Sequence, residues 1–383
     1  MVVTDERAAL HQAVSRLAPE ISERARETER LRAVPADLMD RIKAAGLCRL
    51  ALPTSLGGHE LDPLTIVELI EDLSKADGST GWTTLIGNST AFTAWLDPEV
   101  AARLIGPDPN VSSTSMFGPL GTGVGDGDTL VVNGRWPFSS GAPNAELIQV
   151  GIFVMDGPAP RQRPDGAPDW RFVYVRREEV EIQDTWDAAG LRGTGSHDVV
   201  ISDLAVPARQ TAMPIFDAAP HAGPWWRLPF FCMARTFMVG FPLGVARRAL
   251  DELEALAPTK RRGVAATTVA EDRVAQVEVA RAEGGLQAAR AFVFDALDEA
   301  WSAASEGSPV PASIDDRVKL ATQQAMRAAV DAVDTAYRLG GAGAVYDSHP
   351  LQRCFRDIHA ANQHIIFSDE NWAEYGRSRM APA

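Results

Sequence analysis

The chain contains 383 residues, of which 37 are Lys or Arg and 51 are Asp or Glu, so its formal net charge is −14. An acidic surface repels nucleic-acid phosphates and anionic lipids, so we expect neither a nucleic acid nor a membrane as partner. Hydrophobic residues make up 45% and charged residues 23%, which is typical of a folded globular protein and excludes disorder. Cys48, Cys232 and Cys354 lie far apart without CxxC spacing, which argues against disulfides and a metal site and favours a cytoplasmic location.

Residues 4 to about 105 show a helical pattern. Leu10, Val14, Leu17 and Ile21 recur at steps of three and four residues among charged side chains, as on an amphipathic helix. Neither a signal peptide nor an apolar run long enough to span a membrane is apparent. Further helices are expected at 36–45, at 61–75 and, because it is uncharged and apolar, as a buried segment at 78–95.

The pattern changes to short β-branched or alternating runs between 110 and 207, separated by turns rich in Gly and Pro. These runs predict strands at 129–132, 147–154, 171–175, 180–182 and 199–206. A helical period then returns, and it predicts long helices at about 227–257, 265–305, 312–339 and 351–378. We therefore expect a mostly α protein with a central β domain, divided into residues 1–108, 109–209 and 210–383.

Four motifs occur in an order that resembles the acyl-CoA dehydrogenase superfamily. They are LPTSLGG at 52–58, NGRWPFSSG at 133–141, GLRGT at 190–194, and LGGAG at 339–343 followed by PLQRCFRD at 350–357. The resemblance covers nearly the whole chain. It implies an N-terminal helical domain, a middle β-barrel, a C-terminal four-helix bundle and a homotetramer assembled through that bundle.

The resemblance also implies a flavin near the turn that ends the second motif. Trp136 and Phe138 would supply aromatic faces, Ser139 and Ser140 hydroxyl and backbone donors, and Ser115 would lie along the isoalloxazine ring. An ordinary hairpin with serines in its turn is the alternative. Nearby, Ser196, His197 and Asp198 are interpreted as turn and strand residues rather than as a charge relay.

Residues of a neighbouring subunit would hold the phosphate end of the flavin. By resemblance these are Gly340 and Gly341 in the glycine turn, together with Arg338 and either Arg261 or Arg262. The turn lacks the lysine of a P-loop and follows a helix, which excludes a Walker or Rossmann interpretation. The sequence does not distinguish FMN from FAD.

The carboxylate base of acyl-CoA dehydrogenases is missing from both of its usual positions. Ile365 stands at one of them, and Ala234 with non-acidic neighbours stands at the other. The segment 356–364, RDIHAANQH, instead resembles flavin-dependent monooxygenases of this fold and ends in His364. There, reduced flavin comes from a separate NAD(P)H:flavin reductase and reacts with O2 to a C4a-hydroperoxide. His364 and Ser140 would manage that peroxide as catalytic residues, whereas His359 is interpreted as structural.

The expected substrate is small and largely apolar or aromatic. Asn88 stands where several phenol-hydroxylating members carry a histidine, so oxygenation at C, N or S stays open. Two other functions remain: an acyl-CoA dehydrogenase or oxidase with Asp369 or Glu370 as a displaced base, and a flavin-fold binding protein without turnover. The residues expected to line the substrate site are Trp82, Asn88, Phe92, Phe117, Phe237 and Phe241.

Overall fold

The computed structural model describes residues 2–125, 127–221, 223–261, 267–307 and 309–380. The N-terminal part holds helices α1 (Val2–Leu31), α2 (Ala36–Ala44), α3 (Pro63–Ala76), α4 (Gly78–Gly87) and α5 (Pro98–Ile105). The stretch expected as one buried helix at 78–95 is buried, but α4 gives way at Asn88 to a 3-10 helix, Asn88–Trp95.

Caps in the sequence determine where two of these helices begin. Asp62 accepts the backbone N–H of Thr65 at 3.0 Å, and Pro63 occupies the first turn of α3, as expected. Asp77 accepts the N–H of Thr80 at 2.9 Å and thereby starts α4 directly after α3 ends. The start of α4 lies against α9, since a Cβ at Gly78 would be 2.8 Å from Asp357 Oδ2.

The central part is a sheet. Its strands are β1 (Ser113–Val124), β2 (Thr129–Ser139), β3 (Leu147–Asp156), β4 (Ala159–Pro160), β5 (Trp170–Arg176), β6 (Glu181–Gln183), β7 (His197–Pro207) and β8 (Thr211–Ala212). Their hydrogen-bonded order is β6-β7-β2-β1-β3-β5-β8, with β4 paired to β3. Apolar side chains of β2, β3, β5 and β7 form a core of their own.

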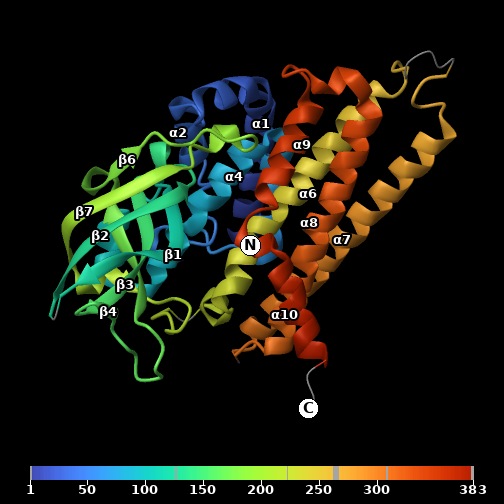
Figure 1. The fold of residues 1–383 in the computed structure, drawn as a ribbon. Coiled ribbons are helices and arrows are strands. Elements are labelled where there is room, and N and C mark those ends of the chain that lie inside the picture. The colour runs from blue at the N-terminus through green and yellow to red at the C-terminus, as the bar shows by residue number, and fades with distance from the viewer. Residues whose placement is uncertain (1, 126, 222, 262–266, 308, 381–383) are drawn as a thin grey trace.

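The C-terminal part consists of α6 (Phe230–Leu256), α7 (Arg273–Ser305), α8 (Ala312–Gly340), α9 (Pro350–Ala361) and α10 (Asp369–Met380). Figure 1 shows the sheet on one side, the long helices α6 to α9 on the other, and α10 extending beyond them. The mostly α fold with a central β domain is thus confirmed, while the exact domain limits remain a prediction. The first two positions of the helix expected at 265–305 lie outside the described residues, and α7 begins only at Arg273.

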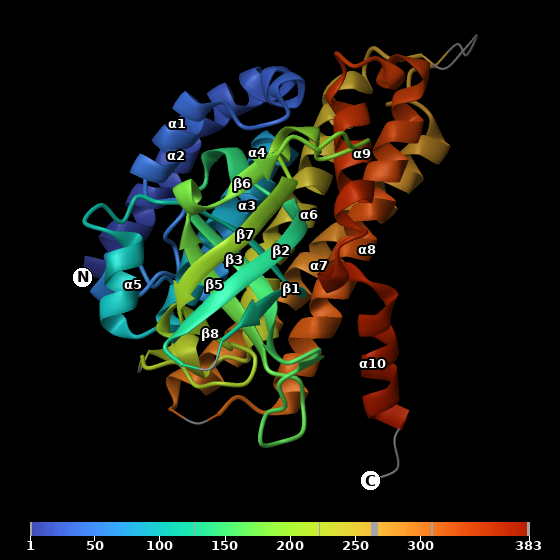
Figure 2. The same cartoon turned by 60° about the vertical axis from the view of Figure 1, so that its left-hand side comes forward.

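Helix α6 joins the two helical parts. A Cβ at Gly240 would lie 2.6 Å from the carbonyl oxygen of Val67, and one at Gly244 would lie 2.1 Å from that of Glu71. Only glycine therefore allows α6 to lie directly against α3. In the view of Figure 2 the sheet lies in front of α3 and α4.

The three cysteines are all buried and unpaired. Burial raises the pKa of Cys48 and that of Cys354 to about 12, and it also raises the pKa of Cys232. Within the described residues, no helix is long and apolar enough to cross a membrane.

Candidate flavin and oxygen site

The turn after β2 was expected to hold a flavin. The register between β2 and β7 shifts between Trp136 and Ser139, and Phe138 adopts a φ of 62°. These irregularities turn the Phe138 ring outward, where it is 63% exposed, while Trp136 points inward and is fully buried. Because Trp136 packs in the core of the sheet and donates to the carbonyl of Gly151 at 2.7 Å, its expected flavin contact has no support.

Ser140 lies one residue beyond β2 and contacts α4. The indole N–H of Trp82 donates to the Ser140 Oγ at 3.1 Å. The Trp82 ring also meets Phe241 of α6 edge to face at 5.0 Å and His364 at 5.7 Å between ring centroids. Four of the residues selected from the sequence, from four separate segments, therefore lie together.

His364 lies beyond the end of α9 rather than inside a continuous helix 351–378. Helix α9 ends at Ala361, and the His364 side chain caps the 3-10 helix Ile365–Phe367 by accepting the N–H of Ile366 at Nδ1, 3.2 Å away. The neutral ring therefore carries its proton on Nε2. Burial lowers the pKa of His364 to about 4, so the imidazole is uncharged near neutral pH.

A chain of buried hydroxyl groups continues from Ser140. The Oγ atoms of Ser140 and Ser196 lie 2.7 Å apart, and that of Ser196 lies 2.6 Å from Thr194 Oγ1. Thr194 Oγ1 in turn donates to the carbonyl of Leu191 at 2.9 Å. The sequence analysis did not assign Thr194 and Ser196 to the site. Only knowledge that the GLRGT motif folds against the serine turn could have indicated that they belong to it.

Buried charges fix the same turn to α9. The Asp357 carboxylate accepts the N–H of Leu191 at 2.6 Å, at a residue with a φ of 51°. Burial, with Asp77 nearby, raises the pKa of Asp357 to about 7. The Arg353 guanidinium lies 3.6 Å from both Asp77 and Glu29 and compensates part of this negative charge. Through Asp357 and Leu191, α9, which leads to His364, is thus connected with the hydroxyl chain that ends at the Leu191 carbonyl.

A second aromatic group lies further along α6. The Phe92 ring lies 5.2 Å from Phe117 and 6.2 Å from Phe237, and Phe230 and Phe172 complete the cluster. These rings pack against one another. The lining of a substrate site by Phe92, Phe117 and Phe237 remains a prediction.

Asn88 was expected to contact the substrate, but its side-chain amide is hydrogen-bonded to backbone groups. Its Oδ1 accepts the N–H of Leu50, and its Nδ2 donates to the carbonyls of Leu47 and Thr84, all within 2.8–2.9 Å. The amide therefore has a structural role, which corrects the expectation. Ser115 is half-buried in β1 opposite Gln149 of β3, and its flavin contact remains a prediction.

The residues expected at the phosphate end lie at the far end of the bundle. Arg338 forms an ion pair with Glu278 at 3.0 Å. The backbone of Arg261 pairs with that of Thr268 in an isolated antiparallel β-bridge. Gly340 has helical backbone angles, whereas Gly341 has a φ of 62°; beside it, Lys260 Cε lies 3.6 Å from where a Cβ would be. Arg262 lies outside the described residues. The assignment of this turn to a neighbouring subunit's flavin remains a prediction.

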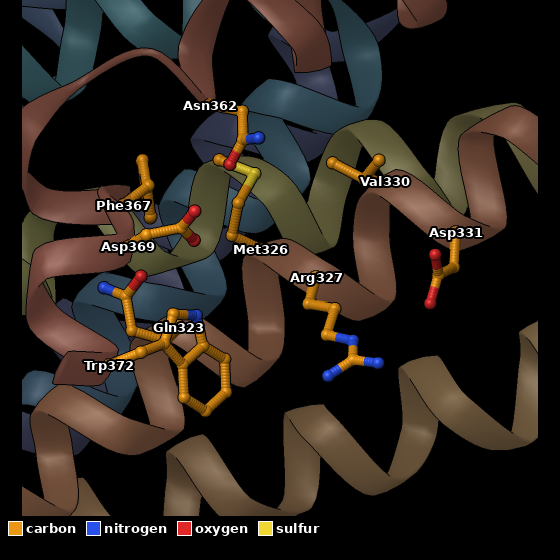
Figure 3. A pocket seen from close by; sticks show the side chains of 9 residues that line it. All are labelled: Gln323, Met326, Arg327, Val330, Asp331, Asn362, Phe367, Asp369 and Trp372. Atoms are coloured by element: carbon orange, nitrogen blue, oxygen red, sulfur yellow. The ribbon is translucent and has the colours of Figure 1, made fainter. Parts of the chain in front are cut away.

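The two carboxylates considered as displaced bases lie in the first turn of α10. Glu370 pairs with Arg377 at 2.6 Å, and both are exposed. Asp369 lines a pocket of about 470 Å³ between α8 and the start of α10, which it shares with Arg327 and Trp372 (Figure 3). No group of three or more His, Cys, Asp or Glu side chains within the described ranges could hold a metal ion.

The residues at the serine turn fit a flavin. Phe138 is exposed and meets the half-buried Trp186 edge to face at 6.3 Å, which offers aromatic surface to a flat ring. Gly141, with a φ of 78°, leaves the backbone uncovered. Beside it, the buried hydroxyl of Thr83 has no partner among the described residues, so it is available to a ligand.

Comparisons with known proteins identify the family. The family model for the acyl-CoA dehydrogenase N-terminal domain matches residues 4–98, and that for the C-terminal domain matches residues 237–369. An indole-3-acetate monooxygenase of Pseudomonas putida is 34% identical over 93% of this chain and 90% of its own length. The oxygenase subunit HsaA, a flavin-dependent monooxygenase of Rhodococcus jostii, is 31% identical over 95% of this chain and 96% of its own.

A solved structure gives the same result. The crystal structure of the 3-HSA hydroxylase from Rhodococcus sp. RHA1 superposes with a TM-score of 0.89 at 28% identity, covering 98% of this chain and 97% of the other. His364 and Ser140, which the sequence motifs singled out, each contact Trp82. The chain therefore belongs to the flavin-dependent monooxygenases that are built on the acyl-CoA dehydrogenase fold.

Proposed function

We propose that the chain is the oxygenase component of a two-component system. A separate NAD(P)H:flavin reductase supplies reduced FMN or FAD, and the chain, as a cytoplasmic homotetramer, uses O2 to oxygenate a small, largely apolar or aromatic substrate. The observation that carries this proposal is the contact of His364 with Trp82, whose indole N–H donates to Ser140. When bound, reduced flavin activates O2 and delivers one oxygen atom to the substrate.

The chain's own residues supply the surroundings for this chemistry. Because its pKa is about 4, His364 is neutral at pH 7 and offers the Nε2–H as a hydrogen-bond donor without placing a charge in the site. Trp82 of α4 packs edge to face against the His364 ring, and Phe241 of α6 packs edge to face against Trp82, so the imidazole lies in largely apolar surroundings. Phe138, Trp186 and Ser140 would hold the flavin.

Two observations support an aromatic substrate: the name of a similar protein and the cluster of phenylalanine rings near α6. Phe237 lies one turn before Phe241 on α6, and Phe92 packs edge to face against both Phe237 and Phe117. Such edge-to-face contacts favour a planar ring among these side chains. The relative from Pseudomonas putida is named for indole-3-acetate. Indole-3-acetate and simple phenols are therefore the first compounds to test, by their stimulation of O2 consumption in the presence of a flavin reductase.

Rapid mixing tests the proposal directly. The purified chain with anaerobically reduced FMN or FAD is mixed with oxygenated buffer, and the return of oxidised-flavin absorbance is followed. We expect a delay relative to free reduced flavin, and a shorter delay in His364→Ala. His359→Ala is the matched control, because His359 pairs with Asp334 at 2.8 Å on the surface. Return at the rate of free flavin would contradict the proposal, and anaerobic bleaching of bound flavin by acyl-CoA thioesters would favour the dehydrogenase alternative.

A further inference from the structure

The hydroxyl chain that begins at Ser140 is closed to water. Ser140 is 6% exposed, Ser196 4% and Thr194 1%. Each hydroxyl has one hydrogen to donate, so in a dry chain the donor at one end determines the direction of every following bond. Both ends of this chain have a defined direction.

At one end the indole N–H of Trp82 can only donate, and it donates to Ser140. At the other end the Thr194 hydroxyl donates to the carbonyl of Leu191 at 2.9 Å, because a carbonyl can only accept. The same oxygen also accepts the indole N–H of Trp186 at 3.0 Å and the backbone N–H of Thr194 at 3.2 Å. Thr194 must then accept from Ser196, and Ser196 must accept from Ser140. The single hydrogen of Ser140 is therefore committed to Ser196, and one lone pair of the Ser140 oxygen is left unused.

We propose that Ser196 and Thr194 are positioning residues that make Ser140 a hydrogen-bond acceptor toward the flavin. This inference rests on the proposed function, in which Ser140 helps to hold the flavin, and it places the Ser140 hydroxyl opposite the flavin N5. Reduced flavin carries a hydrogen on N5 and can donate it to the free lone pair. Oxidised flavin has an unprotonated N5, so two acceptors would face each other. The orientation of the chain thus selects the reduced cofactor over the spent one.

Removal of either positioning hydroxyl should weaken this selection. Without Ser196, the hydrogen of Ser140 is free to turn toward an oxidised N5. Without the Thr194 hydroxyl, Ser196 can donate to Ser140 and reverse the bond between them. Because a net neutral hydrogen bond corresponds to roughly a threefold to tenfold change in affinity, both variants should lower the ratio of the two flavin Kd values by that factor.

The experiment measures Kd for oxidised and for anaerobically reduced FMN and FAD on the full chain. We expect a ratio favouring reduced flavin in the wild type and a smaller ratio in Ser196→Ala and Thr194→Val, mainly through tighter binding of oxidised flavin. Thr194→Ser keeps the hydroxyl and should keep the ratio. Ser89→Ala removes a buried serine hydroxyl that pairs with Ser113 at 2.7 Å and should also leave the ratio unchanged.

The outcomes separate this inference from the function on which it rests. If the wild type binds neither form of flavin, the proposed function fails and the inference fails with it. If it binds flavin but the ratio is the same in Ser196→Ala and Thr194→Val, the inference alone is wrong. Weaker binding of reduced flavin with unchanged binding of oxidised flavin would also overturn it. Should Ser196→Ala not fold, Thr194→Val compared with Thr194→Ser decides the question.

Discussion

Replacement of Asp357 by Asn should change how the stability of the protein depends on pH. The carboxyl group has a pKa of about 7 in the folded protein against 3.8 ordinarily, because it is buried and lies near Asp77. Between these two values the folded chain holds a proton that the unfolded chain has released, so stability falls as the pH rises through this window. The gap corresponds to about 4 kcal/mol at pH values above both pKa values.

The Asn variant removes this titration but keeps an oxygen that can accept the N–H of Leu191. Unfolding by urea should show equal stability of both proteins near pH 4 and a variant that is more stable by about 4 kcal/mol near pH 8. His364 titrates with the opposite sign, since its pKa is lowered and its contribution is lost as the pH falls from 6.5 toward 4. The difference between wild type and variant therefore isolates the Asp357 carboxyl. Parallel curves, or a variant less stable at pH 8, would refute this reasoning.

Three further variants test other parts of the structure. His364→Ala should raise the hydrogen peroxide released per O2 consumed, measured by peroxide assay during turnover; unchanged coupling would remove its assigned role. Phe92→Ala leaves a cavity among four rings and should cost about 3–5 kcal/mol of stability, measured by urea denaturation. Arg353→Met leaves Asp77 and Glu29 without their shared cation, so a loss of about 3–5 kcal/mol is expected at pH 8 and less at pH 5, where the carboxyl groups can protonate. A pH-independent loss would contradict that electrostatic explanation.

Much of the fold could be predicted because local signals agree with it. The cap at Asp62, the glycine-rich turns between strands and the long apolar period of α8 each act within a few residues. Helix 351–378 was wrong as a single element. No Gly or Pro lies between 351 and 375. The break after Ala361 is accompanied by a local cap, in which His364 accepts the N–H of Ile366, and by the burial of Phe367, which is a tertiary effect.

The site was predicted in part. His364, Trp82 and Ser140 follow from motifs, and the structure brings them together. Ser196 was interpreted as a turn residue only, because 56 residues separate it from Ser140 and their contact depends on how the GLRGT turn folds against the serine turn. Trp136 was misplaced for a different reason. The shift in strand register that points it inward and Phe138 outward is not visible in an alternating pattern.

The burial of all three thiols should protect the protein from oxidation by the hydrogen peroxide that it can release. A flavin oxygenase that consumes O2 without substrate releases hydrogen peroxide, which oxidises thiolates rather than thiols. With a pKa of about 12, fewer than about one in a thousand of the Cys48 and Cys354 side chains are ionised at pH 8, and the pKa of Cys232 is also raised. Oxidative damage during idle turnover should therefore begin at exposed thioethers such as that of Met380, before any cysteine reacts.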